Sequence, residues 1–265
     1  MSASSKILCE AEKPGGEVGH ANRFSGGAGQ DYYAPVLCGP STLGALAAAP
    51  ESLRAVLAVL ELLEPDDYGL YLSGFLRAGM QTFGEHWRYA DICTACWAAA
   101  RLLQPRSYLE IGVRRGRSMS MVATAAPRCD LVGFDLWPPE YAGMKSPGKE
   151  LVAREIAKTG HRARLEFVDG DSHVTLGEYF SRNPGACFDL ATVDGDHTED
   201  GAALDLAQVL PRIPAGGVVI FDDIAHPKHP CLAGVWRRAL AAHADFRDWT
   251  FDELGFGVAL AVRMK

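Results

Sequence analysis

The sequence has no long hydrophobic run and no excess of positive charge. None of its apolar stretches approaches the roughly 18 residues of a membrane-spanning helix, and residues 1–20 contain no secretory hydrophobic core. Lys and Arg number 26 against 33 Asp and Glu, which gives a net charge of −7. No basic stripe with interleaved aromatic residues occurs, as nucleic-acid binding would require. These absences predict a cytoplasmic protein that binds neither nucleic acid nor membrane.

Cysteine is sparse and has no obvious pairing. The seven cysteines are an odd number at scattered positions, which is typical of reduced thiols in a cytosolic protein. Cys93 and Cys96 have the C-x-x-C spacing of redox and zinc sites, but no second C-x-x-C follows. Because they lie within a helical pattern, we interpret them as small buried residues on one helix face.

The first hundred residues lack a repeating pattern of elements. Residues 1–45 are rich in Gly, Ser and Ala without a period, which predicts a loosely ordered arm or lid. Residues 46–104 are expected to form an N-terminal helical segment, with helices over 51–63 and 87–104. The intervening stretch 66–86 contains three glycines and is mixed in character.

From residue 105 onward, strand and helix patterns alternate. Strands are expected at 107–112, 131–136, 164–169, 187–193 and 216–221. Helices are expected near 116–126, 147–159, 173–182, 199–210 and 231–243. The last stretch, 247–262, indicates two strands around a turn. This alternation predicts an α/β fold over 105–265, with a Rossmann-like, doubly wound, mostly parallel seven-stranded sheet containing one antiparallel strand.

Acidic residues stand where the fourth and fifth predicted strands end. Asp194 follows the fourth strand, and Asp222 and Asp223 follow the fifth. Because the carboxyl ends of parallel strands meet at one edge of a sheet, these three carboxylates should converge. Converging carboxylates are unfavourable unless they share a cation, and oxygen ligands favour Mg²⁺. Alternatively, Asp194 belongs to a simple turn, and Asp222 or Asp223 caps the following segment.

The first predicted strand is followed by a turn that contains glycine. Gly112 and Gly116 would let the backbone turn tightly and approach a ligand closely. The spacing departs from the dinucleotide fingerprint because Arg114 occupies the place of the middle glycine, which disfavours NAD. Arg114 and Arg117 would either contact an acidic substrate or form a solvated helix start.

Further acids end the second and third predicted strands. Asp135 lies where an α/β nucleotide fold has an acid that accepts hydrogen bonds from ribose hydroxyls. Asp171 and Ser172, after the third strand, could bind an adenine. Each acid could instead cap the next helix. Together with Glu110 at the end of the first strand, the series favours a nucleoside-like ligand.

The order of these motifs resembles that of class I S-adenosylmethionine-dependent methyltransferases. The resemblance covers roughly residues 105–262 and rests on EIGVRRGRS at 110–118, Asp135, GDS at 170–172, DGDH at 194–197 and GGVVIFDD at 216–223. Within that class it is strongest for small-molecule O-methyltransferases that often require magnesium, of the catechol, macrolide-sugar and cephalosporin-biosynthesis types. The N-terminal hundred residues match no family.

The resemblance implies a role for each matching residue. The residues that would surround the methionine portion of S-adenosylmethionine are Glu110, Gly112, Gly116 and Ser118. Asp135 would bind the ribose, and Asp171 and Ser172 would bind the adenine. Asp194 would lie beside this cofactor-binding set. The residues that match the magnesium ligands of the family are Asp194, Asp222 and Asp223.

Three histidines follow the fourth and fifth predicted strands and lie at the same edge. One of them could take a proton from an acceptor hydroxyl. The candidates are His226, on a loop expected to overhang the pocket, and His197, which begins a helix and could equally be structural. Asp194 is a third candidate base if the metal does not fully engage it.

The leading hypothesis is S-adenosylmethionine-dependent, Mg²⁺-assisted O-methylation of a small-molecule hydroxyl, on a sugar or phenol of natural-product biosynthesis. A second hypothesis is a metal-independent N- or O-methyltransferase with a histidine base. A third is a non-catalytic S-adenosylmethionine-binding protein. The identity of the acceptor and the formation of a homo-oligomer are left open by the sequence.

Overall fold

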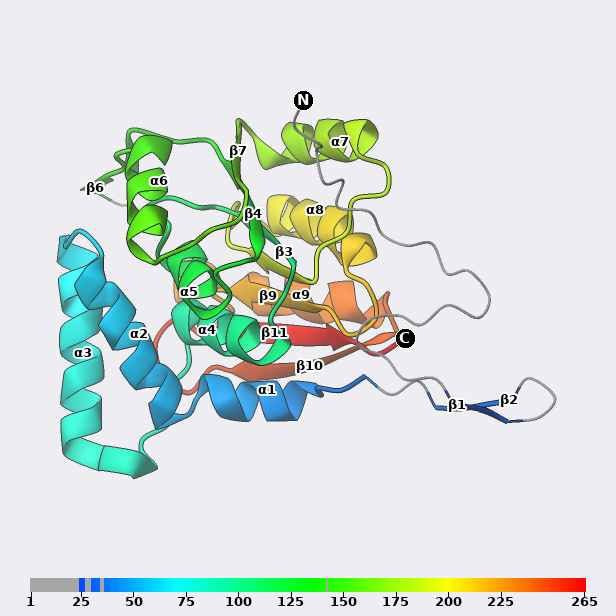
Figure 1. The fold of residues 1–265 in the computed structure, drawn as a ribbon, viewed down its shortest axis with the longest axis horizontal. Helices are drawn as coiled ribbons and strands as arrows, with labels where there is room; N and C mark the ends of the chain where they lie inside the picture. Colours follow the sequence, from blue (N-terminus) through cyan, green and yellow to red (C-terminus); the bar gives the residue numbers. More distant parts are fainter. Residues whose placement is uncertain (1–23, 27–29, 34–35, 142) are drawn as a thin grey trace.

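A seven-stranded sheet covered by helices on both faces forms the centre of the protein (Figure 1). The computed structural model describes residues 24–26, 30–33, 36–141 and 143–265. The strand order is β10-β11-β9-β8-β3-β4-β7, and β11 runs antiparallel to both of its neighbours. The sheet therefore has one reversed strand, as predicted. Its strands are β3 (Ser107–Ile111), β4 (Asp130–Asp135), β7 (Leu165–Asp169), β8 (Leu190–Val193), β9 (Val218–Asp222), β10 (Phe246–Phe251) and β11 (Val258–Arg263).

The two faces of the sheet pack against separate hydrophobic cores because side chains alternate along each strand. In β9, Val218 and Ile220 enter one core, and Val219 and Phe221 enter the other. The first core is shared with α5 (Arg117–Ala125) and α6 (Lys149–Lys158). The second is shared with α7 (Ser172–Arg182), α8 (Glu199–Val209) and α9 (Leu232–Ala241). The predicted βα units are confirmed, with ends shifted by a few residues.

The strand order reverses between β3 and β8. The chain passes outward from β3 through β4 to β7, and then returns so that β8 pairs with the other side of β3. In open α/β sheets, ligands bind beyond the carboxyl ends of the strands at such a switch point. The ends of β3 and β8 therefore mark the part of the molecule where a cofactor is expected.

Within its described residues, the N-terminal segment contributes four α-helices, two of which the sequence did not indicate. They are α1 (Pro40–Ala47), α2 (Pro50–Leu62), α3 (Asp67–Phe83) and α4 (Ile92–Leu103). Helix α1 begins at Pro40, inside the predicted arm of residues 1–45. Its Leu43 is fully buried in the core, which stabilises the helix there. Of the rest of that arm, the structure describes only residues 36–39 and a short strand pair, β1 (Phe24–Gly26) and β2 (Gln30–Tyr33).

Helix α3 occupies the stretch that was expected to be mixed. Asp66 caps it by accepting a hydrogen bond from the Gly69 amide at 2.9 Å. Gly79 is required by packing, since a Cβ there would lie 2.1 Å from the Trp87 ring. Glycine in this helix thus permits a close contact that a pattern of apolar residues does not reveal.

Helices α2, α3 and α4 share the first core with the sheet. Cys93 and Cys96 are buried in α4, with free thiols, as the interpretation of a helix face predicted. Among the described residues, no single helix has the length and apolar character to cross a membrane, and only the bent pair α1–α2 passes such a test together.

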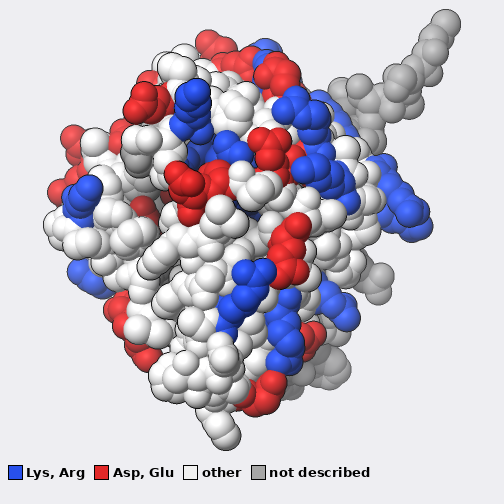
Figure 2. Space-filling model, turned by 90° about the vertical axis from the view of Figure 1, so that its left-hand side faces the viewer, with Lys and Arg blue, Asp and Glu red and all other residues white. Residues whose placement is uncertain are grey.

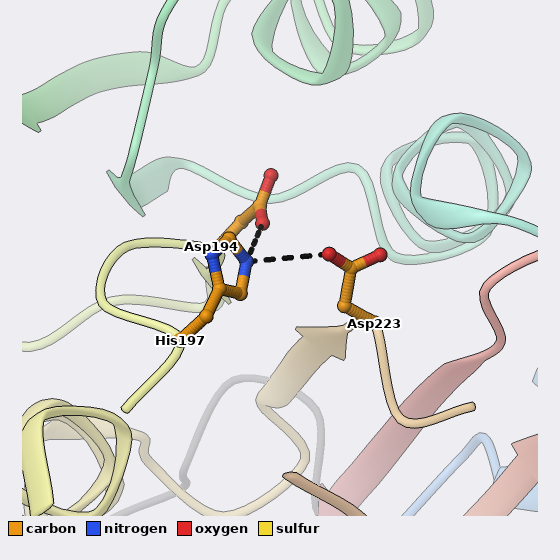
Figure 3. A group of neighbouring side chains, drawn as sticks. All are labelled: Asp194, His197 and Asp223. Atoms are coloured by element: carbon orange, nitrogen blue, oxygen red, sulfur yellow. Dashed lines mark hydrogen bonds and ion pairs between the residues drawn. The ribbon is translucent and has the colours of Figure 1, made fainter. Parts of the chain in front are cut away.

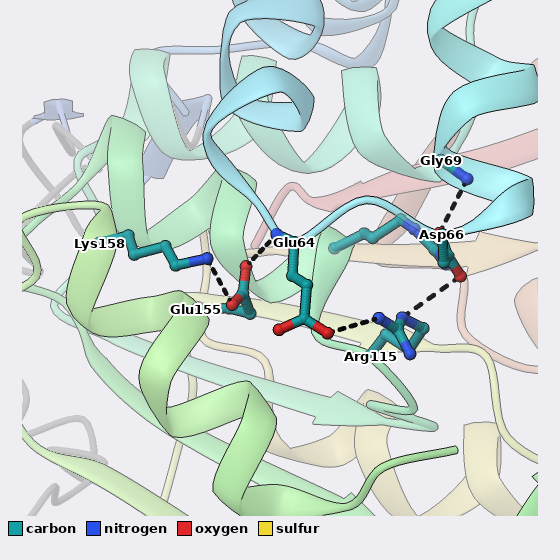
Figure 4. A network of polar contacts seen from close by, with 7 residues as sticks. Glu64, Asp66, Gly69, Arg115, Glu155 and Lys158 are labelled. Carbon is teal, nitrogen blue, oxygen red and sulfur yellow. Dashed lines mark hydrogen bonds and ion pairs between the residues drawn. The ribbon is translucent and has the colours of Figure 1, made fainter. Parts of the chain in front are cut away.

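An ion-pair network joins the turn between α2 and α3 to the helix that follows the glycine turn (Figure 4). Arg117 donates to both carboxylate oxygens of Asp66, at 2.6 and 2.5 Å, and the Arg115 Nε lies 3.3 Å from Asp66. The two arginine side chains are only 14% and 11% exposed. Arg117 also lies over the Tyr68 ring, 5.1 Å from its centroid. It is therefore not a solvated helix start.

The network continues toward α6. The Glu64 amide donates to Glu155 at 2.7 Å, and the other oxygen of Glu155 pairs with Lys158 at 2.7 Å. Figure 2 views the molecule from the side where α3 and α6 lie, and shows acidic and basic side chains interspersed there. Neither sign of charge forms a continuous patch on that face.

Replacing Asp66 should destabilise the fold. We expect Asp66→Ala to lower the free energy of unfolding by about 2–4 kcal/mol, because two mostly buried guanidinium groups lose their partner and α3 loses its N-cap. Urea denaturation followed by circular dichroism measures this. The matched control is Glu61→Ala, which breaks an ion pair with Arg77 in which both side chains are more than half exposed, and should cost less than about 1 kcal/mol. Equal losses in the two variants would contradict the role given to Asp66.

Candidate active site

The carboxyl ends of β3, β4, β8 and β9 lie level with one another. The Asp194 amide donates to the Ile111 carbonyl at 2.9 Å, and the Gly112 amide donates to the Phe134 carbonyl at 2.9 Å. Val193 stands opposite Phe221 in the sheet, so that Asp194 and Asp222 follow adjacent strands at the same height. The prediction that these acids reach one edge of the sheet is confirmed.

The glycines of the first turn are required by packing within the protein. Gly112 has a φ of 84°, and a Cβ there would lie 1.9 Å from the Asp194 carbonyl oxygen. Gly116 has a φ of 70°, and a Cβ there would lie 2.5 Å from the Val152 side chain on α6. Both positions exclude other residues before any ligand is considered. Their predicted contact with the cofactor stays a prediction.

Glu110 is completely buried at the end of β3. The Tyr108 hydroxyl donates to one carboxylate oxygen at 2.7 Å, and the Ser118 hydroxyl donates to the other. Burial raises the pKa of Glu110 to about 8, reinforced by the charges of Asp194 and Asp135 and opposed by the two hydroxyls. Glu110 is therefore mostly protonated at neutral pH in the ligand-free protein.

Asp135 organises the loops on both sides of its strand. Its carboxylate accepts hydrogen bonds from the Arg114 amide at 2.7 Å and from the Trp137 amide at 2.5 Å. The Trp137 indole in turn donates to Asp169 at the end of β7, at 2.9 Å. Asp135 thus ties the glycine turn to the next loop, and each of its oxygens keeps a lone pair for a further donor such as a ribose hydroxyl.

Asp171 and Ser172 stand at the start of α7. Asp171 is the N-cap and accepts a hydrogen bond from the His173 amide at 2.9 Å, so the capping alternative is confirmed for this residue. Its side chain is about half exposed, and Ser172 is partly buried. The predicted adenine contacts of both residues remain predictions.

Asp194, His197 and Asp223 form a compact polar cluster (Figure 3). The His197 Nε2 lies 3.3 Å from an oxygen of Asp194 and 3.3 Å from an oxygen of Asp223. Each of the three side chains offers a ligand atom within 4.8 Å of the others. Asp223 adopts a left-handed backbone conformation, with a φ of 60°, which turns its carboxylate back toward Asp194.

The charges in this cluster are not balanced. Burial and the neighbouring Asp194 charge raise the pKa of Asp223 to about 7, although His197 lowers it. Burial lowers the pKa of His197. Its hydrogen bond to Asp194 and the charges of Asp194 and Asp223 raise the pKa by more than burial lowers it, so the net shift is upward. The arrangement therefore attracts a positive charge, supplied either by the imidazolium or by a cation.

Asp222 does not join the cluster. Alternation along β9 directs its side chain to the same face as Val218 and Ile220, which is the face that α4 covers. Its pKa is raised well above the usual range by burial, by Asp194 and Asp223, and by Asp91. Of the three predicted metal ligands, the structure brings Asp194 and Asp223 together with His197. The Asp222 side chain points instead to the face of the sheet that α4 covers.

His226 lies outside the cluster but is connected to it by stacked rings. His197 stacks on His229, His229 contacts His226 with the same centroid separation of 4.8 Å, and His226 contacts Phe256 at 4.2 Å. Burial and the neighbouring His229 and His197 lower the pKa of His226. Its Nδ1 accepts a hydrogen bond from the Lys228 amide at 3.1 Å. The neutral ring therefore carries its proton on Nε2 and presents a donor, which makes His226 a poor candidate for a general base.

The N-terminal segment supplies side chains near the acidic edge that the sequence did not single out. Burial raises the pKa of Tyr68 and Tyr89, and the charges of Asp91 and Asp222 raise it further. The only signal in the sequence is the density of aromatic residues over 68–89.

Comparison with known proteins agrees with this arrangement. Residues 109–224 match a family model described as "Methyltransferase domain". No curated protein matches the chain.

Two solved structures illustrate the likeness in fold. The O-methyltransferase TomG from Streptomyces achromogenes, involved in tomaymycin synthesis and solved in complex with SAM, is 24% identical, with a TM-score of 0.50 over 77% of this chain and 92% of its own. An O-methyltransferase from Bacillus cereus, solved in complex with SAH, is 18% identical, with a TM-score of 0.50 over 81% of this chain and 99% of its own. At such identities the likeness shows the fold alone. The sheet has the strand order of the class I methyltransferase fold, and the family match covers residues 109–224 of the chain.

Proposed function

We propose that this protein is a class I S-adenosylmethionine-dependent methyltransferase and that it methylates a hydroxyl of a small molecule at a metal-assisted site. The observation that carries the proposal is the cluster of Asp194, His197 and Asp223 beside the glycine turn at the strand switch point. O-Methylation is the activity named for TomG and for the Bacillus cereus protein, which share the fold. A sugar or phenol of natural-product biosynthesis is the proposed acceptor.

The cofactor is proposed to lie across the ends of β3, β4 and β7. Glu110 would face its amino group, Asp135 its ribose, and Asp171 with Ser172 its adenine. The bound cofactor supplies an electrophilic methyl group on a sulfonium sulfur. Since displacement at that methyl is in line, the chain must chiefly orient the acceptor and remove its proton.

The acidic edge is proposed to hold Mg²⁺ through Asp194 and Asp223. Asp222, the third predicted ligand, would join them only by turning its side chain away from the face that α4 covers. Carboxylate oxygens are the ligands that Mg²⁺ prefers, and a bound divalent ion lowers the pKa of an acceptor hydroxyl. Burial and the Asp194 charge raise the pKa of Asp223 to about 7, and a bound cation would favour its carboxylate form. Asp194 lies between the cluster and the glycine turn, so it would be the residue nearest to both the metal ion and the cofactor.

A metal-independent mechanism is the second candidate, and one observation favours it. His197 already places its Nε2 within 3.3 Å of both carboxylates, where an imidazolium can balance their charge without a metal. In that mechanism the pair of His197 and Asp194 would receive the acceptor proton. His226 is less suited because its Nδ1 is already an acceptor for Lys228.

Chelation should distinguish the two mechanisms. We expect EDTA to abolish methyl transfer to a panel of phenols and sugar derivatives, and Mg²⁺ to restore it, with Asp194→Asn reducing kcat by about 100-fold or more. The control is Asp200→Asn, an exposed acid on α8 that should leave kcat unchanged. Activity that survives both EDTA and Asp223→Ala would eliminate the metal mechanism. A pH–rate profile that changes in His197→Gln would then support the histidine mechanism.

Cofactor binding should release a proton from Glu110. Its pKa is about 8 in the ligand-free protein, and an ammonium group beside it favours the carboxylate. We therefore expect S-adenosylhomocysteine to displace up to about one proton at pH 7. Calorimetry in two buffers of different ionisation enthalpy, with EDTA present, measures the number.

Two variants make the proton measurement specific. Glu110→Gln should abolish the release, whereas Asp171→Asn should weaken binding and leave the proton count unchanged. Tight binding by the wild-type protein with no proton release would contradict the placement of the amino group at Glu110.

A further inference from the structure

Asp205 is a fully buried acid on α8 for which the proposed reaction has no direct use. Neither of its carboxylate oxygens meets strict hydrogen-bond geometry with a partner among the described residues, although the Ser172 hydroxyl and the Asp196 amide lie close enough to stabilise its charge. The His173 Nε2, 3.8 Å away, has no such partner either. Burial raises the pKa of Asp205 to about 6, although Ser172, His173 and the Asp196 amide lower it. A buried polar group without a good partner is unfavourable. The pair therefore has a hydrogen bond available that this state of the protein does not form.

Asp205 supports the loop that carries Asp194. A Cβ on Gly195 would lie 2.9 Å from the Asp205 Oδ2, so the carboxylate packs directly against the Gly195 backbone. Gly195 immediately follows Asp194, and Asp196 comes next, with a carboxylate oxygen 3.9 Å from the His173 Nε2. The position of Asp205 thus limits where the loop 194–196 can lie.

His173 connects Asp205 to the proposed adenine side. It stands in the first turn of α7, which packs beside α8. Its Nδ1 lies 3.3 Å from the Asp171 Oδ1, and its backbone amide donates to that same oxygen at 2.9 Å. The imidazole therefore lies between Asp171 on one side and Asp205 on the other.

We infer that His173 and Asp205 are a positioning pair that links adenine recognition to the loop bearing Asp194. The inference rests on the proposed function, because it requires the adenine amine to bind Asp171. Once that amine donates to Asp171, the His173 ring is released from the carboxylate and turns its Nε2–H onto Asp205. The 3.8 Å separation needs only a small rotation to become a hydrogen bond. Neither residue touches the reacting atoms, and both act through Asp171 and the 194–196 loop.

The test compares two ligands that differ at the adenine amine. S-Adenosylhomocysteine has the amine, and S-inosylhomocysteine has a carbonyl oxygen in its place. We expect Asp205→Leu and His173→Phe, which remove the acceptor and the donor of that hydrogen bond, each to weaken S-adenosylhomocysteine binding about tenfold, with little change for S-inosylhomocysteine. The double variant should lose no more than either single variant, because both remove the same hydrogen bond. Isothermal titration calorimetry provides the four sets of dissociation constants.

The controls separate positioning from stability. Asp205→Leu keeps a similar shape and replaces a buried acid with an apolar group, so its melting temperature should equal or exceed that of the wild-type protein. Asp200→Asn, on the exposed side of the same helix, should alter neither ligand's affinity. If Asp205→Leu does not fold, the partly exposed His173→Phe still provides the comparison.

The outcomes distinguish the inference from the proposed function. A wild-type protein that binds neither ligand would overturn both. A wild-type protein that prefers S-adenosylhomocysteine, with variants that keep the same preference, would overturn only the positioning pair. Additive losses in the double variant would also overturn it, since the two residues would then act separately.

Discussion

Repulsion among carboxylates at the carboxyl edge of the sheet is the constraint on which the site depends. Glu110 near the end of β3, Asp194 directly after β8 and Asp222 at the end of β9 stand on three adjacent strands, and Asp223 follows Asp222. Burial weakens solvent screening, so that their pKa values rise or a positive partner becomes necessary. The protein meets this condition differently at each position. Hydroxyl groups and a proton accompany Glu110, an imidazole accompanies Asp194 and Asp223, and Asp222 is withdrawn to the helical side.

The N-terminal segment completes the acidic edge and fixes the turn beside it. Asp66 holds Arg115 and Arg117, which lie directly after the glycine turn, so a displacement of α3 would be transmitted to the proposed methionine site. Tyr68, two residues after Asp66, is close enough to Asp222 for its pKa to respond. The connection between α2 and α3 therefore contacts the segment that follows the glycine turn and lies near the acidic edge. This gives the helical segment a role in the site as well as in the core.

Much of the architecture could be predicted because its causes are local. Short apolar runs alternate with amphipathic helices, and this period sets the βα units and the reversed strand. The common edge of Asp194 and Asp222 follows from parallel pairing. Helix α3 was not predicted because the reason for its glycine is not local. In the sequence Gly79 suggests a helix break, whereas in the structure it makes room for the Trp87 ring inside the helix packing. Arg117 was misread for a similar reason, since its partner Asp66 is distant in sequence.

The sequence by itself determined which residues reach the acidic edge, because strand ends and side-chain alternation are encoded within a few neighbouring positions. Only the tertiary structure decided how those residues are partnered. The left-handed backbone of Asp223 and the ring of His197 bring that pair to Asp194, while alternation along β9 turns Asp222 away. These choices depend on loop conformation and on contacts between α7, α8 and the sheet. Distances of a few ångströms between segments that are distant in sequence then decide which acid is protonated and which acid pairs with a histidine or a cation.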